Sequence, residues 1–300
     1  RAFRLLRVFR ILDVFGRIET TLTQYSRGSE HCPPYAALSY VWGDPKELMP
    51  IVVNGHTLKI GMSLYQALTH LRVVLPASTL LWVDAISINQ NDIQERNDQV
   101  KQMREVYSEA SEVLIWLGPS FQGSDELLRY IREHESRCFE RMASGQGCVA
   151  PPYHELRNAM QTLVRLPYWE RYWIIQEFVV ARHARFVCGS ETIRRDQLLG
   201  VLYEYVNTSS GHFLQTPLHI SPRDHWKVGR IEKIAAWQES SVHLAEALER
   251  THTSEATDPR DKVFSLLGLV TEGAGRDVVV DYAHAPCIVY CIAIEAMMED

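Results

Sequence analysis

Short runs of apolar residues alternate with longer amphipathic segments along the first two thirds of the chain. Each run has the length of a buried strand, and turn residues such as Gly43-Asp44-Pro45 follow it. Strands that alternate with helices in this way form parallel β-α-β units with helices on both faces of the sheet. The pattern therefore predicts an α/β fold with a doubly wound, mainly parallel sheet, like that of flavodoxin. The predicted strands are residues 36–42, 80–86, 113–117 and 185–189, and the predicted helices are residues 63–74, 92–110 and 168–181.

Turn and cap residues add a hairpin to this pattern and mark the starts of two of the helices. Asn54-Gly55 lies between β-forming residues of segment 51–60, and this dipeptide is the strongest short signal for a hairpin. Ser63 is the predicted N-cap of the helix that follows. Asp92 and Glu95 have the spacing of a capping box at the start of the amphipathic helix.

The remaining segments predict how the chain is organised. Residues 120–166 read as an insertion, with a helix near 125–135, a loop and a second helix. The chain is expected to be mainly helical from Asp196 onward, with a polar loop at 212–224 and a break at 253–259. Residues 278–280 are a candidate strand before a final helix. We therefore predict one domain over residues 1–300, with an α/β core at about 35–190 and a helical part at about 191–300.

Composition excludes several kinds of partner. The 300 residues are 46% hydrophobic and 23% charged, a globular balance, and the net charge of -6 with scattered Lys and Arg argues against nucleic acid. No apolar run approaches the roughly 18 to 20 residues of a membrane-spanning helix.

Residues 1–15 are Arg-rich and apolar, which fits either a mitochondrial presequence or an edge strand, and the edge strand is favoured. A start at Arg1 rather than Met is typical of a fragment.

The six cysteines contain no C-x-x-C pair, so the spacing indicates neither a disulfide framework nor a zinc ribbon. We expect all six thiols to be reduced and free of metal, in keeping with a cytoplasmic protein. Cys287 and Cys291 lie one helical turn apart near His284, which leaves a metal site as an alternative. A buried apolar pair on a helix is the favoured interpretation.

Common catalytic signatures such as G-x-S-x-G, the Walker loop and H-E-x-x-H are absent. Four other blocks are present: YAALSYVWGD at 35–44, LWVDAISINQ at 81–90, PYWERYWIIQE at 167–177 and ATDPRDKVFSLLG at 256–268. In order and spacing they resemble the heterokaryon incompatibility (HET) domain of fungi, over nearly the whole chain. The resemblance implies a cytoplasmic, death-inducing signalling module. Ser87 stands where the family usually has cysteine, so a required nucleophilic or metal-binding cysteine is not expected there.

A second resemblance is to Toll/interleukin-1 receptor (TIR) domains. Residues 39–44 are similar to the Ser-aromatic-x-Gly-acid pattern that ends the first TIR strand, with one extra residue, and Trp173 and Glu177 match the later Trp-x-x-x-Glu helix. Several enzymes of that class cleave NAD+ with this glutamate. The resemblance therefore implies a TIR-like fold, NAD+ as substrate rather than cofactor, and Glu177 as the catalytic residue.

One carboxylate is chemically sufficient for this reaction, because nicotinamide leaves as a neutral molecule and needs no general acid. The carboxylate would hold the ribose and stabilise the oxocarbenium-like transition state. In open α/β sheets, ligands bind beyond the carboxyl ends of the strands. The residues expected to surround the substrate there are Ser39, Tyr40, Trp42, Gly43, Asp44, Asp84, Asn89 and Trp173.

Each candidate also has a purely structural explanation. Trp42 and Trp173 fit core aromatics, Asp44 fits a turn, Asp84 fits a cap of backbone amides, and residues 258–261 fit a helix start with an ion pair. Three functions remain open: an NAD-cleaving enzyme activated by clustering, a non-enzymatic module that assembles with its own kind, and a nucleotide sensor that does not cleave. The expected partners are further copies of the chain and an NLR-like sensor or fused regulatory domain.

Overall fold

Four parallel strands form the centre of the structure. The computed structural model describes residues 2–8, 16–143, 153–208, 222–239, 242–270 and 273–299. The central strands lie in the order β6-β3-β7-β8, and each pairs in parallel with its neighbour. This order confirms the predicted doubly wound α/β fold, because the chain crosses over between successive strands. The strands are β3 (Ala36–Tyr40), β6 (Leu80–Trp82), β7 (Glu112–Gly118) and β8 (Ala184–Cys188).

Further strands extend this centre into a sheet of nine strands within the described residues, in the order β5-β4-β2-β1-β6-β3-β7-β8-β9, and they pair antiparallel except for β2 with β4. The prediction of an edge strand near the start of the chain is wrong, because β1 (Ala2–Val8) lies between β2 (Glu19–Ser26) and β6. Leu5 and Leu6 pack into the cores on opposite faces of the sheet, as in an interior strand. Residues 9–15 of that prediction lie outside the described part. The outer strands are β4 (Leu48–Val53), β5 (His56–Gly61) and β9 (Glu191–Arg194).

Three predicted elements are shorter or divided. The predicted strand 80–86 ends at Trp82, and α2 (Asp84–Ser87) follows, because a continuous apolar run does not distinguish a strand from a buried helix. The predicted helix 92–110 is divided into α3 (Ile93–Val100) and α4 (Met103–Glu109). The predicted helix 168–181 is divided into a 3-10 turn, η1 (Pro167–Glu170), and α7 (Trp173–Val179).

The predicted hairpin is present, with Asn54 and Gly55 at φ 49° and 79° between β4 and β5. The predicted cap Ser63 is wrong: α1 (Met62–Val74) begins one residue earlier, and Gly61 is its N-cap. Asp92 does cap α3, since its side chain accepts from the Glu95 amide at 3.1 Å. Glu95 does not complete the capping box, because its carboxylate pairs with Arg4 instead.

Replacement of Gly55 by alanine is expected to destabilise the protein by about 1 kcal/mol, because a side chain at positive φ is strained even where space is open. Gly200→Ala is the matched control, since Gly200 lies exposed in α8 (Arg195–Thr208) and nothing obstructs a Cβ there. That change should stabilise by about 0.5–1 kcal/mol. Urea unfolding of both variants measures the difference, and equal shifts would contradict the assigned turn.

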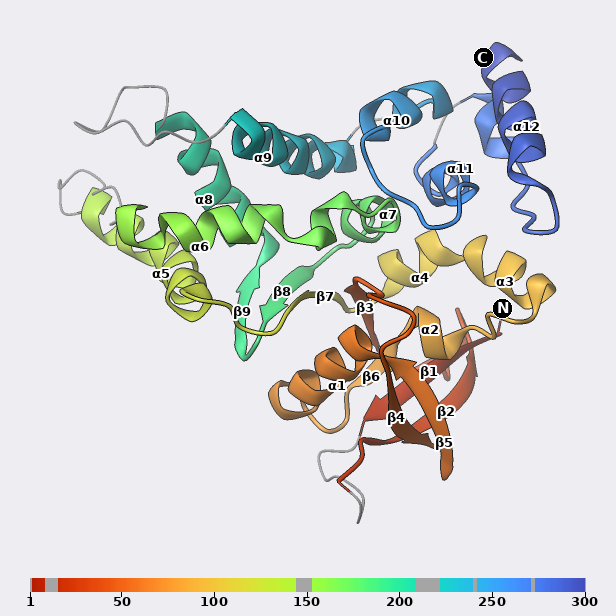
Figure 1. Ribbon diagram of the computed structural model, residues 1–300, viewed down its shortest axis with the longest axis horizontal. Helices are drawn as coiled ribbons and strands as arrows, with labels where there is room; N and C mark the ends of the chain where they lie inside the picture. Colours follow the sequence, from red (N-terminus) through yellow and green to blue (C-terminus); the bar gives the residue numbers. More distant parts are fainter. Residues whose placement is uncertain are drawn as a thin grey trace.

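Helices cover both faces of the central strands (Figure 1). Ala36, Leu38 and Tyr40 of β3 belong to the core beneath α1. Ala37 belongs to the larger core on the other face, which includes residues of α4 and α7. Successive residues of a strand point to opposite faces, so Ser39 is also directed toward α7.

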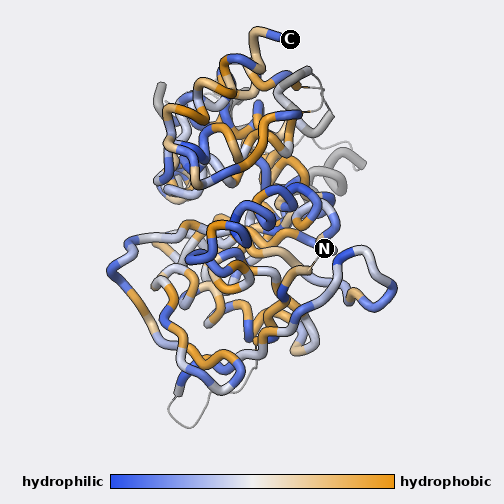
Figure 2. Tube along the Cα trace, turned by 90° about the vertical axis from the view of Figure 1, so that its right-hand side faces the viewer, coloured by the Kyte–Doolittle hydropathy of each residue, from blue (hydrophilic) through white to orange (hydrophobic). Residues whose placement is uncertain are grey.

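The insertion and the C-terminal part add helices on the α7 side. Figure 1 shows α10, α11 and α12 at the opposite end from β4 and β5, and Figure 2 shows the C-terminus at the same end in a second view. The predicted strand 278–280 is wrong, because these residues pair with no strand. Most of the predicted loop 212–224 lies outside the described residues, and α9 already begins at Pro222. Among the helices described, none combines the length and apolar character that crossing a bilayer requires. These elements are α5 (Ser124–Ala143), α6 (Tyr153–Arg165), α9 (Pro222–Ala235), η2 (Ala236–Glu239), α10 (Leu244–Thr251), α11 (Asp261–Leu267), η3 (Ala274–Asp277) and α12 (Pro286–Glu299).

Candidate functional site

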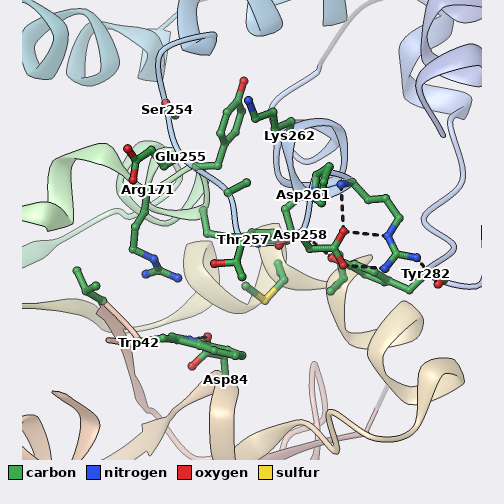
Figure 3. A pocket seen from close by; sticks show the side chains of 18 of the residues that line it. Trp42, Asp84, Arg171, Ser254, Glu255, Thr257, Asp258, Asp261, Lys262 and Tyr282 are labelled. Atoms are coloured by element: carbon green, nitrogen blue, oxygen red, sulfur yellow. Dashed lines mark hydrogen bonds and ion pairs between the residues drawn. The ribbon is translucent and has the colours of Figure 1, made fainter. Parts of the chain in front are cut away.

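A cleft of about 1080 Å³ lies beyond the carboxyl ends of β3 and β6 (Figure 3). Its first wall comes from the α/β core, and includes Trp42 and Gly43 after β3 and Asp84 after β6. Its second wall comes from the helical part, chiefly residues 254–262. Pockets of this size hold drug-sized or nucleotide-sized ligands, and the carboxyl ends of parallel strands are where such ligands bind.

Trp42 and Asp84 form a hydrogen-bonded pair on the first wall. The Trp42 indole Nε1 donates to Asp84 Oδ2 at 2.8 Å, and the Ala85 amide donates to Oδ1 at 2.7 Å. Burial raises the pKa of the Asp84 carboxyl, while Arg171 and the Trp42 indole act against that rise. The Trp42 side chain remains 45% exposed. Its indole is therefore fixed in orientation and still open to a ligand.

Glu177 lies behind the first wall rather than in it. It is 2% exposed, and the Ser39 hydroxyl donates to its carboxylate. Ser39 Oγ also lies 2.9 Å from the Tyr168 hydroxyl. Burial raises the pKa of Glu177 from 4.5 to about 7, although Arg171 and Ser39 lower it. A carboxyl with this pKa changes its charge near neutral pH, which is typical of functional sites.

Arg171 is the cation between these carboxyl groups and the cleft. Its guanidinium lines the cleft, donates to the Tyr40 carbonyl oxygen and lowers the pKa values of both Asp84 and Glu177. Its backbone is held by an isolated β-bridge to Glu255, beside which the Tyr172 amide donates to the Glu255 carbonyl at 3.0 Å. This bridge explains why the predicted helix is divided at Arg171.

Residues 258–261 form the expected helix start and ion pair, and they also line the cleft. Arg260 Nη2 lies 2.8 Å from Asp258 Oδ2, and α11 begins at Asp261. The buried Asp261 carboxylate accepts from the Tyr282 hydroxyl at 2.5 Å. Burial raises the pKa of Asp261, and hydrogen bonds from Tyr282 and the Trp173 side chain lower it. The carboxylate thus connects α11 to the first residue of α7.

The structure separates the predicted site residues into three groups. Trp42, Gly43, Asp84 and Trp173 line the cleft. Ser39, Tyr40 and Glu177 are buried and do not line it. Asp44 and Asn89 are exposed outside its lining: Asp44 Oδ1 accepts from the Lys46 amide at 2.8 Å, and Asn89 Oδ1 accepts from the Asn91 amide at 3.3 Å.

Sequence reasoning missed Arg171 and Thr257 as cleft residues. Both lie inside blocks that carry the family resemblance, so the blocks contained the signal although no spacing rule identified the two residues. The β-bridge joins positions 171 and 255, which are far apart in sequence, so a pattern within a short segment does not reveal it.

None of the four cysteines whose side chains the structure describes lines this cleft. Cys32, Cys188, Cys287 and Cys291 are free thiols, while the side chains of Cys138 and Cys148 lie outside the described part. The interpretation of Cys287 and Cys291 as a buried pair is wrong, because both are exposed. Within the part of the chain that the structure describes, no group of three or more His, Cys, Asp or Glu side chains could hold a metal ion.

Comparison with known proteins identifies the α/β core. The family model of the heterokaryon incompatibility protein (HET) matches residues 35–177, which include both Trp42 and Glu177. The chain is 30% identical over 202 residues to heterokaryon incompatibility protein 6, OR allele, of Neurospora crassa, an alignment that covers 54% of this chain and 29% of that protein. The chain thus spans less than a third of that relative's length. No solved structure matches it. Residues 35–177 of this chain therefore match the heterokaryon incompatibility (HET) family.

Proposed function

We propose that the chain is a cytoplasmic effector of fungal incompatibility and cell death, and that its cleft binds NAD+ and hydrolyses the bond between nicotinamide and ribose. The name of the Neurospora crassa relative and the family match support the incompatibility role. The observation that carries the enzymatic part is Glu177, a buried carboxyl with a pKa near 7 directly behind the wall of a nucleotide-sized cleft. It stands one helical turn from Trp173, as in the TIR enzymes that the sequence resembles.

The proposed reaction balances without a metal or redox partner. The bond between ribose C1′ and the pyridinium nitrogen breaks, its electron pair stays with nicotinamide, and water adds to C1′. The products are nicotinamide, ADP-ribose and one proton. A carboxylate beside the ribose stabilises the positive charge that develops on the sugar. Trp42 offers an open aromatic face for a cationic ring, with the Asp84 carboxylate at its edge.

The depth of Glu177 bears on how the reaction is controlled. Arg171 lines the cleft beside the buried carboxylate, so Glu177 reaches the ribose only after the first wall rearranges. We propose that clustering of several copies, driven by an NLR-like sensor or a fused regulatory domain, favours the rearranged state. The same depth also favours the second candidate function, a non-enzymatic module in which Glu177 only stabilises the fold and assembly alone transmits the signal.

Incubation of the protein with NAD+ tests the proposal. The chain is fused to an inducible oligomerisation domain, and free nicotinamide is followed by chromatography with and without the inducer. We expect nicotinamide and ADP-ribose to accumulate in equal amounts on clustering. A clustered protein that causes death in fungal cells while it leaves NAD+ intact would contradict the enzyme and support the non-enzymatic module.

A further inference from the structure

Two of the three acidic side chains in residues 254–262, Asp258 and Asp261, already have partners, whereas the exposed Glu255 carboxylate has none among the described residues. Asp258 accepts from Arg260 and lies 3.5 Å from Arg96 Nη2. Asp261 accepts from Tyr282, as described above, and Glu170 pairs with Lys227 at 2.6 Å. Asp258, Asp261 and Glu170 therefore have little free capacity to accept hydrogen bonds from a ligand.

Three side chains that line the same cleft can still donate hydrogen bonds to a ligand. Within the described residues, the Thr257 hydroxyl and the Lys262 ammonium have no hydrogen-bond or ion-pair partner. The contact that Lys262 does make is with the Tyr172 ring, whose centre lies 5.9 Å from Lys262 Nζ. Arg171 donates to a single acceptor, although a guanidinium carries five N–H groups. Donors without partners at a cleft fit a ligand that is rich in acceptors.

The bridge between Arg171 and Glu255 places these donors on neighbouring backbone. Thr257 follows the bridge by two residues, so it stays within one short stretch of the Arg171 backbone. In Figure 3 the Arg171 guanidinium extends toward Trp42, while Lys262 lies on the far side of the cleft from Asp84. The donors thus span the space between the aromatic platform and the second wall.

We propose that Arg171, Thr257 and Lys262 bind the diphosphate group of a nucleotide, so that residues 254–262 form a phosphate-binding wall of the cleft. Phosphate oxygens accept several hydrogen bonds at once, and arginine and lysine supply the positive charge that a neutral sugar hydroxyl does not require. The proposal rests on the proposed function in that NAD+ contains this diphosphate. The inference extends the proposed function by assigning ligand contacts to Thr257 and Lys262, which lie beyond the family-matched segment 35–177.

Asp84 and Glu177 at the first wall and Glu255 at the second are negative groups near Arg171 that oppose an anion. Burial raises the pKa values of Asp84 and Glu177, and Glu177, whose pKa is about 7, is only partly ionised near neutral pH. Asp84 and Glu177 lie at or behind the first wall, whereas Thr257 and Lys262 belong to the second. The diphosphate is therefore placed nearer the second wall.

Calorimetric binding of ADP and of adenosine tests this assignment on the whole chain. We expect ADP to bind more tightly than adenosine, and its affinity to fall with rising salt. Lys262→Gln and Thr257→Val should each weaken ADP binding by roughly ten-fold, because each removes a hydrogen bond to a charged group, and leave adenosine unchanged. Thr257→Ser should restore binding. Lys233→Gln, at an exposed position of α9 outside the cleft, is the matched charge control.

Thermal melting of each variant first establishes that it is folded, and Arg171 is left unchanged because it is the counter-charge of two buried carboxyls. The assignment is overturned if ADP fails to bind, if it binds no better than adenosine, or if both variants bind it like the wild type. ADP binding without any cleavage of NAD+ would refute the enzyme and keep the phosphate site. Cleavage of NAD+ with unchanged ADP affinity in the variants would refute the phosphate site and support the enzyme.

Discussion

Replacement of Glu177 by glutamine is expected to lower nicotinamide release by the clustered protein about 10²- to 10³-fold. Glutamine keeps the size and helix propensity of glutamate but lacks the negative charge that stabilises a developing ribosyl cation, and loss of one such contact typically has this effect. Rates are best compared at pH 8, above the pKa of about 7, where most of the wild-type carboxyl is ionised. The measurement is the initial rate of nicotinamide release at saturating NAD+.

A matched control separates this effect from a general loss of carboxylates. Glu126 is exposed on α5 and does not line the cleft, so Glu126→Gln should release nicotinamide at the wild-type rate. Both variants are melted alongside the wild type to show that they are folded. Equal rates for wild type and Glu177→Gln would remove Glu177 from the mechanism.

The stability of the wild type is expected to fall by about 2–3 kcal/mol between pH 5 and pH 8 because of Glu177 alone. The pKa of this carboxyl is 4.5 in the unfolded chain and about 7 in the folded one, so the folded state holds more protons between these values. The free energy of unfolding therefore decreases as pH rises through this window, and the loss is complete above the folded pKa. Its full size is about 3 kcal/mol, since each pKa unit corresponds to about 1.4 kcal/mol.

Urea unfolding of wild type and Glu177→Gln at several pH values isolates this contribution. Asp84 and Asp261 also have raised pKa values and change stability in the same direction, but they are present in both proteins and cancel in the difference. The free energy of unfolding of the variant should depend less on pH, so the variant should become more stable relative to the wild type as pH rises. Parallel curves for the two proteins would show that Glu177 is ionised in the folded state without cost, contrary to its burial.

Local patterns predicted the central sheet well. The four apolar runs became parallel neighbours because strand length and helical crossovers are properties of short segments. Asn54-Gly55 formed the expected hairpin for the same reason, since positive φ at both positions is encoded in two residues. The errors arose where packing overruled local preference: β1 is interior because Leu5 and Leu6 find cores on both faces, and the α7 region is divided because Arg171 pairs with Glu255.

The candidate site shows the same division. Sequence alone determined the family blocks, the helix that carries Trp173 and Glu177, and the edge of the sheet at which the cleft lies, because these follow from residue identity and strand direction. Only the tertiary structure decided that Glu177 lies behind the cleft, that Trp42 stays open, and that residues 254–262 supply the second wall. Burial, and the pKa shift that burial causes, depend on contacts between segments distant in sequence, and no local pattern contains them.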